Sequence, residues 1–195
     1  LVQARLTIAS LVFIPILLRK KYLILLKPAW KHSLVLAVTN NAIPFSLFSY
    51  GSFGADSNIL AILNATTAFN TMIIALLWLG EKVTFKQVFG LLLGFVGVII
   101  LVNPESSSTS IISALFCLIG AACYSFSTVF IQKYSEKTDK MVLIGWSIIF
   151  SCFIMIPFTL LNLPPQIPST KALLSATWLG SISTGLAFFG YVYLI

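Results

Sequence analysis

Long apolar runs separated by short polar connections dominate the chain. Seven of these runs are candidate membrane spans, at residues 1–18, 33–53, 57–79, 88–102, 110–131, 141–161 and 172–195. About 20 apolar residues in a helix cross the ~30 Å hydrocarbon core of a bilayer, and turn residues fill the connections. The runs do not alternate apolar and polar positions, as the strands of outer-membrane barrels do. The pattern therefore predicts an all-α, polytopic helical membrane protein with seven transmembrane helices.

The shortest run, 88–102, is preceded by a helix start signal. Thr84 and Gln87 have the spacing of a capping box, in which each side chain bonds the backbone N–H of the other residue. The charge of Lys86 can reach the membrane surface along its alkyl stem. These residues predict a helix that begins just after the preceding loop and lengthens this span.

The low charge content supports a membrane protein. Of 195 residues, 58% are hydrophobic and 9% are charged, whereas average globular chains carry about 25% charged residues. A net charge of +7 in a soluble protein would suggest a nucleic-acid partner. Here the charges lie in the connections, so the predicted partner is the lipid bilayer and not nucleic acid. The three cysteines lie in apolar runs without metal-type spacing, which favours packing roles and predicts no metal or cofactor.

Lysine and arginine residues are distributed unevenly between alternate connections. Loops 19–32, 80–87 and 132–140 hold ten of them, while 54–56, 103–109 and 162–171 hold one, Lys171. Cytoplasmic loops carry the excess of these residues in membrane proteins. The three basic loops are therefore predicted to face the cytoplasm in a multi-pass protein of the inner (plasma) membrane, and the first span runs from outside to inside.

A faint internal repeat relates the two halves of the chain. At an offset of 142, Pro15 aligns with Pro157 and Ala9 with Ser151; at 143, Asn41 aligns with Thr184, Phe45 with Phe188 and Tyr50 with Tyr193. Each match alone is near chance. The offset covers five spans, and an odd number of spans inverts the second copy in the membrane. Inverted repeats of this kind are common in transporters, with substrate sites near the midplane.

Residues 62–102 contain a distinctive set of elements, which are Asn64-Ala65-Thr66-Thr67, Leu79-Gly80-Glu81, Thr84, Gln87, Gly90, Gly94 and Gly97. With these elements the segment resembles the fourth and fifth helices of the EamA-type drug/metabolite transporter superfamily. Upstream, Arg5 and the basic residues 19–21 resemble the family's second helix, and residues 110–195 resemble the first three helices of its second repeat. Many family members carry proline after the threonine pair, where this chain has Ala68. A straighter fourth helix is therefore expected.

The resemblance implies a ten-helix transporter built from two inverted five-helix repeats. Residues 1–102 would form the first repeat without its first helix, and residues 110–195 the first three helices of the second. The chain begins without methionine and ends inside an apolar run. Both features are typical of a fragment that covers helices two to eight of the ten.

Amide and hydroxyl side chains interrupt the uncharged run 57–79. They are Asn64, Thr66, Thr67, Asn70 and Thr71. Residues three and four apart share a helix face, so Asn64, Thr67 and Thr71 lie on one face. The stripe fits either interhelical hydrogen bonds or a substrate cavity. The asparagines favour a cavity, because threonine can bond the preceding turn of its own helix.

Three residues outside this stripe are candidates for the same cavity. Asn41 shortly precedes Pro44, which weakens the helix and can expose carbonyls to a ligand. Tyr124 brings a hydroxyl near mid-membrane, and Thr184 is the repeat partner of Asn41. The predicted substrate-binding residues are therefore Asn41, Asn64, Thr67, Asn70, Tyr124 and Thr184, with Phe69 and Phe126 as apolar walls. Packing is the alternative role for each of them.

Other distinctive residues favour structural roles. Gly90, Gly94 and Gly97 form a face that permits close helix packing. For Arg5, reaching the membrane surface explains its position better than an anion site does. Glu81 is expected to form a salt bridge with a loop or a neighbouring helix.

Acidic chemistry is confined to the connections. Asp56, Glu81, Glu105, Glu136 and Asp139 all lie in loops, whereas proton-driven transporters place a carboxylate or histidine within the membrane. Either the coupling group lies outside this chain, or transport is facilitated diffusion or exchange. With no nucleophile elbow, phosphate loop or cluster of metal ligands in the sequence, no enzyme activity is predicted.

These patterns predict a secondary transporter that moves a small metabolite by alternating access. An amino acid, an amino-acid derivative or a similar polar or amphipathic solute is the substrate that the resemblance implies. The alternative is a non-transporting membrane scaffold or an inactive, truncated transporter. Substrate identity, direction, coupling ion and oligomeric state stay open.

Overall fold

The computed structural model describes residues 2–102, 110–161, 170–187 and 190. Every regular element among these residues is helical, with no strand, which confirms the all-α class. The elements are α1 (Val2–Leu17), α2 (Lys20–Leu36), η1 (Ala37–Ala42), α3 (Ile43–Gly51), α4 (Ser57–Ala65), α5 (Thr67–Leu79), α6 (Phe85–Val102), α7 (Ile111–Ser135), α8 (Lys140–Leu161), α9 (Thr170–Trp178) and η2 (Leu179–Leu186). The connections 103–109 and 162–169, and the repeat partners Phe188 and Tyr193, lie outside the described residues.

Three helices are long and apolar enough to cross a membrane. They are Ser57–Leu79, Ile111–Ser135 and Lys140–Leu161, and Val2–Leu17 and Phe85–Ile100 are shorter apolar helices. These elements coincide with five of the seven predicted spans. The chain divides into two compact units, which are unit 1 (Leu1–Ala42 and Tyr134–Ile195) and unit 2 (Ile43–Lys133).

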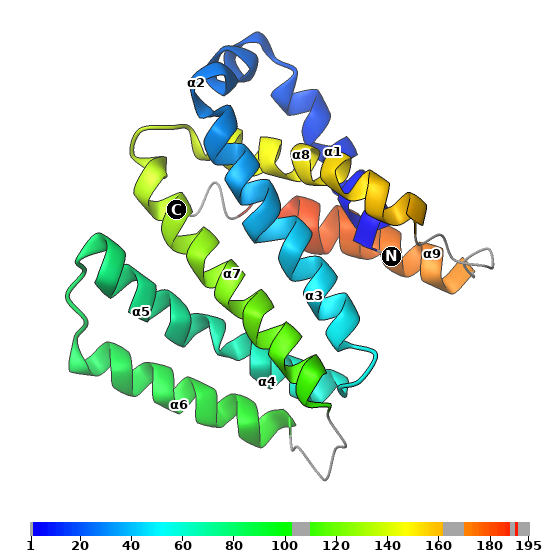
Figure 1. Ribbon diagram of the computed structural model, residues 1–195. Helices are drawn as coiled ribbons and strands as arrows, with labels where there is room; N and C mark the ends of the chain where they lie inside the picture. The colour runs from blue at the N-terminus through cyan, green and yellow to red at the C-terminus, as the bar shows by residue number, and fades with distance from the viewer. Residues whose placement is uncertain (1, 103–109, 162–169, 188–189, 191–195) are drawn as a thin grey trace. The chain divides into compact units, whose positions relative to one another are not determined.

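Unit 1 is organised around α8, against which α1, α2 and η1 pack, while η2 packs on α1 (Figure 1). On α1, the fully buried residues Leu6, Phe13 and Leu17 recur at helical spacing. On α8 their counterparts are Leu143, Ile144 and Ile148. An apolar stripe on each helix therefore forms the core of this unit.

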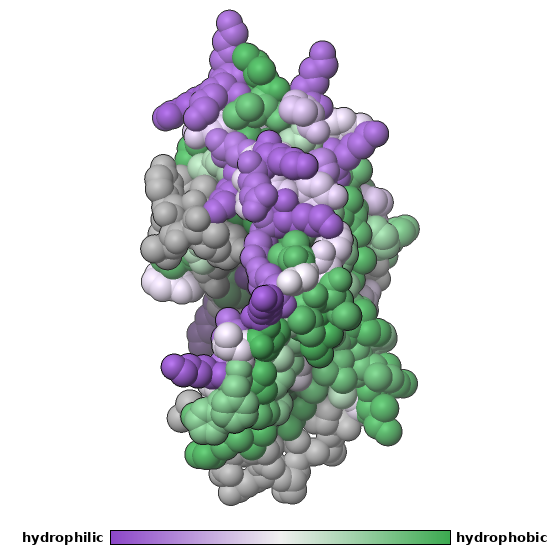
Figure 2. Space-filling view, turned by 90° about the vertical axis from the view of Figure 1, so that its left-hand side faces the viewer, coloured by the Kyte–Doolittle hydropathy of each residue, from purple (hydrophilic) through white to green (hydrophobic). Residues whose placement is uncertain are grey.

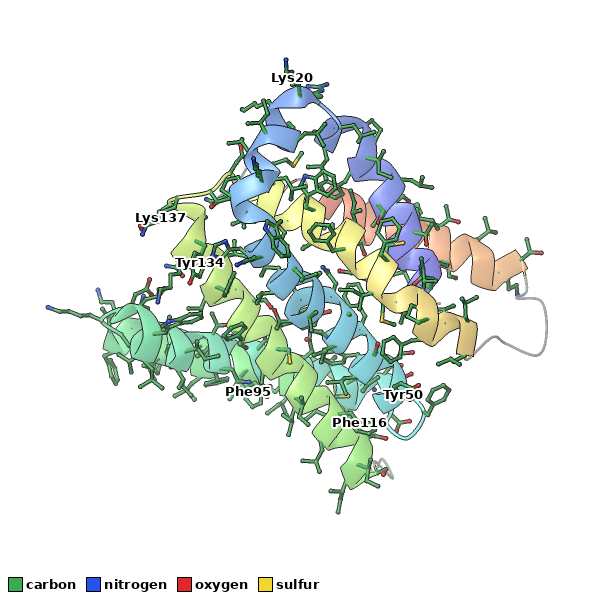
Figure 3. The ribbon with its side chains drawn as sticks, turned by 45° about the horizontal axis from the view of Figure 1, so that its top comes forward. Lys20, Tyr50, Phe95, Phe116, Tyr134 and Lys137 are labelled. Atoms are coloured by element: carbon green, nitrogen blue, oxygen red, sulfur yellow. The ribbon has the colours of Figure 1, made fainter. Side chains whose placement is uncertain are left out.

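The basic segment 19–32, which the sequence predicts to be a loop, is mostly helical. Residues 20–51 form one uninterrupted helical run made of α2, η1 and α3. Lysine and leucine are good helix formers, so the helix continues past the apolar run instead of ending with it. Lys20 lies at the turn between α1 and α2 (Figure 3). Figure 2 shows hydrophilic residues gathered at the end that carries this turn.

Two wide π-helical segments interrupt the α-helical pattern in unit 1. The first, η1, ends two residues before Pro44, and the second is η2. Proline lacks the backbone N–H that would complete the preceding α-helical turn. This defect agrees with the weakened helix that the sequence predicts at Pro44. Such wide turns occur frequently at functional sites.

Unit 2 is held together by contacts that α7 makes with α3 and α5. A Cβ atom at Gly51 would clash with Cys117 Sγ, and one at Gly120 would lie 3.0 Å from the ring of Phe48. Trp78 on α5 stacks on Phe126 with ring centroids 5.3 Å apart. The helix α6 packs on α4.

Within the membrane-length helix 57–79, the α-helical hydrogen-bond pattern has a local break at Thr66. Thr66 separates α4 from α5, and its hydroxyl donates to the carbonyl of Leu63 at 2.6 Å. The sequence predicts a straighter helix here, because Ala68 replaces the proline of many relatives. The break observed at Thr66 lies two residues before Ala68. A threonine hydroxyl that bonds its own helix in this way is known to bend helices.

Close helix packing occurs at other glycines than those predicted. A Cβ atom at Gly90, Gly94 or Gly97 would meet no heavy atom within 4 Å among the described residues. Close approaches are found instead at Gly51, Gly120, Gly145 and Gly180. The spacing of small residues marks a surface that permits close packing, but it does not identify the neighbour.

The predicted capping box is confirmed. Thr84 N–H donates to Gln87 Oε1 at 2.8 Å, and Gln87 N–H donates to Thr84 Oγ1 at 3.4 Å. The helix α6 begins at Phe85, immediately after the threonine. Two backbone donors at this helix start are thereby satisfied.

Thr84→Ala is expected to lower the free energy of unfolding by about 1 kcal/mol, because the helix loses its N-terminal cap. Thermal unfolding of the purified protein in detergent measures this change. Thr84→Ser keeps the hydroxyl and is expected to unfold like the wild type. Equal losses in both variants would show that the cap does not stabilise α6.

Candidate functional site

The six predicted substrate-binding residues divide between the two units. Asn41 and Thr184 belong to unit 1, and Asn64, Thr67, Asn70 and Tyr124 belong to unit 2. Each group has its own neighbours within its unit.

Asn41 lies on η1 and is fully buried. Its side-chain Nδ2 donates to Ser147 Oγ on α8 at 3.3 Å. One turn further along α8, Ser151 Oγ donates to the carbonyl of Ser147 and lies 3.1 Å from the carbonyl of Ala37. We call Asn41, Ser147 and Ser151 the η1–α8 cluster. All three side chains are fully buried, so the cluster is a polar site inside an apolar unit.

Asn41 Oδ1 has no hydrogen-bond partner among the described residues, although it is buried. Leaving a buried acceptor without a partner costs about 1–3 kcal/mol. Most buried polar atoms in native proteins are satisfied, and each exception calls for an explanation. The sequence identifies Asn41 as a candidate but gives no information about its partners on α8. The sequence signals for those partners are the i, i+4 spacing of Ser147 and Ser151 and their alignment with Arg5 and Ala9 at the repeat offset of 142.

Thr184 lies on η2 and is also buried. Arg5 Nε on α1 donates to Thr184 Oγ1 at 2.6 Å. Reaching the membrane surface is the role that the sequence favours for Arg5. The structure adds a second feature, because the part-buried guanidinium makes a charge-assisted hydrogen bond to a buried hydroxyl.

In unit 2, Thr67 lies where α5 meets α7. Ser125 Oγ lies 2.9 Å from the Thr67 carbonyl and 2.8 Å from the Ala121 carbonyl of its own helix, and Thr71 Oγ1 donates to the Thr67 carbonyl at 2.7 Å. Thr67 Oγ1 is buried and has no hydrogen-bond partner among the described residues. Ser125, which the sequence did not single out as a site residue, therefore holds α7 against the polar stripe.

Aromatic side chains predicted near the cavity pack on other rings. Tyr124 lies 6.0 Å from Phe48 and 6.3 Å from Phe45 between ring centroids. Phe126 stacks on Trp78, and Phe69 packs edge-on against Phe95 at 5.2 Å. Phe95 is labelled on α6 in Figure 3. These contacts support a packing role for the predicted apolar walls Phe69 and Phe126.

Asn64 and Asn70 differ from the other candidates in their exposure. Asn64 is exposed and Asn70 is half-buried. Neither side chain makes a hydrogen bond within the part of the chain that the structure describes. The two amides are therefore available to a ligand or to a further helix.

Glu81 accepts a hydrogen bond from Gln132 Nε2 at 2.5 Å, and Lys133 Nζ lies 4.5 Å from the centre of the Trp78 ring. The predicted salt bridge of Glu81 is therefore replaced, among the described residues, by a bond to a neutral amide. No group of three or more metal-ligating His, Cys, Asp or Glu residues occurs in the described ranges.

The family model and the relatives that match this chain are all named as transporters or efflux pumps. The model of the EamA-like transporter family matches residues 1–103 and 111–195. The chain is 26% identical over 154 residues to the uncharacterized transporter YvbV of Bacillus subtilis, covering 78% of this chain and 50% of that protein. It is 27% identical over 122 residues to a probable amino-acid metabolite efflux pump of Salmonella typhimurium, covering 60% of this chain and 40% of the pump.

The chain spans about half the length of the curated relatives it matches. A solved crystal structure matches 98% of this chain and 67% of its own with a TM-score of 0.76. The sequence identity in that comparison is 17%, so the similarity concerns the fold. The family and the relatives are named as transporters and not as enzymes.

Proposed function

The chain belongs to the EamA-like transporter family, and on that premise we propose that it forms part of a secondary transporter for a small metabolite. The family match over residues 1–103 and 111–195 carries this proposal. Alternating access between two inverted repeats is the proposed mechanism. The repeats are residues 1–102 and 110–195, in an inner membrane with loops 19–32, 80–87 and 132–140 in the cytoplasm.

The proposed substrate is an amino acid, an amino-acid derivative or a similar polar or amphipathic solute. One relative is named as a probable amino-acid metabolite efflux pump. The polar groups predicted to bind substrate are amides and hydroxyls, on Asn41, Asn64, Thr67, Asn70, Tyr124 and Thr184. Uncharged groups of this kind suit a neutral or zwitterionic solute better than a multiply charged one.

Asn64→Leu is expected to abolish uptake of the transported solute into proteoliposomes while expression and folding survive. The Asn64 side chain is exposed and lies outside the buried core of the described residues. A panel of radiolabelled amino acids and amino-acid derivatives supplies the substrates, and size-exclusion chromatography checks the fold.

Asn58→Leu serves as the matched control, because Asn58 lies in the first turn of the same helix and outside the polar stripe. Uptake by this control and its loss in Asn64→Leu would support a cavity on this helix. Unchanged uptake in Asn64→Leu would remove Asn64 from the site. A full-length protein that transports no member of the panel, but unfolds at lower temperature when its stripe is replaced by leucine, would favour the scaffold.

A further inference from the structure

The two π-helices occupy equivalent places in the proposed inverted repeat. The first, η1, begins at residue 37 and η2 begins at residue 179, an offset of 142. This is the offset that aligns Pro15 with Pro157. The helices against which they pack are also equivalent in the repeat, since η1 packs on α8 and η2 packs on α1.

The hydrogen bonds at the two π-helices are equivalent as well. Asn41 on η1 bonds Ser147 on α8, and Thr184 on η2 bonds Arg5 on α1. Asn41 and Thr184 are 143 residues apart, and Arg5 and Ser147 are 142 residues apart. The two contacts thus involve matching positions but different chemistry, because a guanidinium at one becomes a serine hydroxyl at the other.

At the η1–α8 cluster both serine hydroxyls already donate to carbonyls, and the Asn41 amide nitrogen donates to Ser147 Oγ. Ser147 Oγ donates to the carbonyl of Ile144 at 2.7 Å, and Ser151 Oγ donates to the carbonyl of Ser147. Because the Ser147 hydrogen is committed, Ser147 Oγ accepts from Asn41 Nδ2, which orients the amide. The polar atom of the cluster that has no partner among the described residues is an acceptor, Asn41 Oδ1. Its partner must be a hydrogen-bond donor or a cation.

We propose that the η1–α8 cluster binds a small monovalent cation through Asn41 Oδ1. At the equivalent place on η2 the protein supplies such a group itself, the guanidinium of Arg5. Amide, hydroxyl and backbone oxygens are the ligands that alkali ions and ammonium groups take, and unwound helix carbonyls serve the same purpose in transporters.

The neutral character of the cluster limits the charge of its ligand. Its three side chains are uncharged, and the described acidic residues Asp56, Glu81, Glu136 and Asp139 lie outside the long helices of unit 1 and the π-helices. If a divalent ion were buried here without carboxylate ligands, most of its desolvation cost would not be offset. Sodium and the primary ammonium group of a zwitterionic solute both meet the requirement. The ammonium source rests on the proposed transport function, whereas the sodium source does not.

Thermal unfolding of the purified full-length protein tests the proposal without measuring flux. The midpoint is followed while sodium, potassium or methylammonium chloride replaces choline chloride at constant ionic strength. A saturable rise is expected with sodium or with methylammonium, because a ligand that binds the folded state stabilises it. A rise of the midpoint with sodium alone identifies an ion site. A rise with methylammonium and with free amino acids, but not with N-acetyl amino acids, identifies a site for the ammonium group of a substrate.

Asn41→Leu is expected to raise the apparent dissociation constant by about tenfold or more. Ser33→Ala is the matched control, since Ser33 is a buried hydroxyl on the same helical run that donates to the Val142 carbonyl of α8. The control is expected to titrate like the wild type. If Asn41→Leu does not fold, Asn41→Asp is measured instead and is expected to tighten cation binding.

Equal midpoint shifts in all salts would overturn the proposal, and so would an Asn41 variant that titrates like the wild type. Because the readout is stability, a protein that transports nothing would still test the site. Transport without any cation-specific stabilisation would overturn this inference and leave the transporter proposal intact.

Discussion

Gly180→Leu is expected to prevent η2 from packing on α1 and to lower the free energy of unfolding by about 3 kcal/mol. A Cβ atom at Gly180 would lie 2.8 Å from Ile8 Cβ and 2.9 Å from the Arg5 carbonyl oxygen. Neither of these atoms can move without shifting the α1 backbone. Thermal unfolding in detergent and the yield of monodisperse protein measure the loss.

Gly94→Ala is the matched control, because no described heavy atom lies within 4 Å of the added Cβ. It is expected to leave the unfolding midpoint unchanged or slightly raised. Gly145→Ala provides a graded comparison, since the new Cβ would meet the Leu17 methyl groups, at 2.8 and 3.0 Å. Leu17→Ala should therefore partly rescue Gly145→Ala, whereas Ile8→Ala should not rescue Gly180→Ala. Rescue at both positions would contradict the backbone clash proposed for Gly180.

The helical fold follows from the sequence because long apolar runs have few alternatives in a membrane. Backbone groups in lipid must be satisfied internally, so each run becomes a helix. The errors occur at the ends of runs. Lys20 to Lys31 is predicted as loop from its charge, but charge excludes a segment from lipid without excluding it from a helix. The capping box at Thr84 succeeds because both of its partners are three residues apart in sequence.

For the candidate site, too, the sequence identifies individual residues but not their distant partners. The repeat and Pro44 identify Asn41 and Thr184 from the sequence, and the structure finds both buried on π-helices. Their partners Ser147 and Arg5 are more than 100 residues away in the chain. Spacing rules describe neighbours on one helix, so they cannot identify which serine or arginine a distant asparagine or threonine meets.

The spacing of the glycines likewise does not reveal which of them pack closely against another helix. The spacing of Gly90, Gly94 and Gly97 is visible in the sequence, yet the described chain places no atom against them. Gly180 does not belong to a series of glycines at this spacing, yet it makes the close approach to Arg5 and Ile8. Close packing is a property of two surfaces, and the sequence of one helix describes only one of them.

Trp78→Ala is expected to lower the free energy of unfolding by about 2–3 kcal/mol, because α5 loses its aromatic contacts with α7. Trp78 stacks on Phe126 at an interplanar angle of 16°, lies 6.1 Å from the Phe130 ring centroid, and has Lys133 Nζ 4.5 Å from its own centroid. These three partners lie on one face of α7, at positions i, i+4 and i+7. Unfolding followed by heat or by denaturant in detergent measures the loss.

Trp178→Ala is the matched control, because Trp178 is 65% exposed on α9. It is expected to change the midpoint little, and Trp78→Phe is expected to retain most of the stability because a ring remains to stack. The same variants separate the two roles considered for Phe126. If Phe126 packs against Trp78, Phe126→Ala and Trp78→Ala should be non-additive when combined. Additive losses, together with uptake that fails only in Phe126→Ala, would instead assign Phe126 to the wall of the substrate cavity.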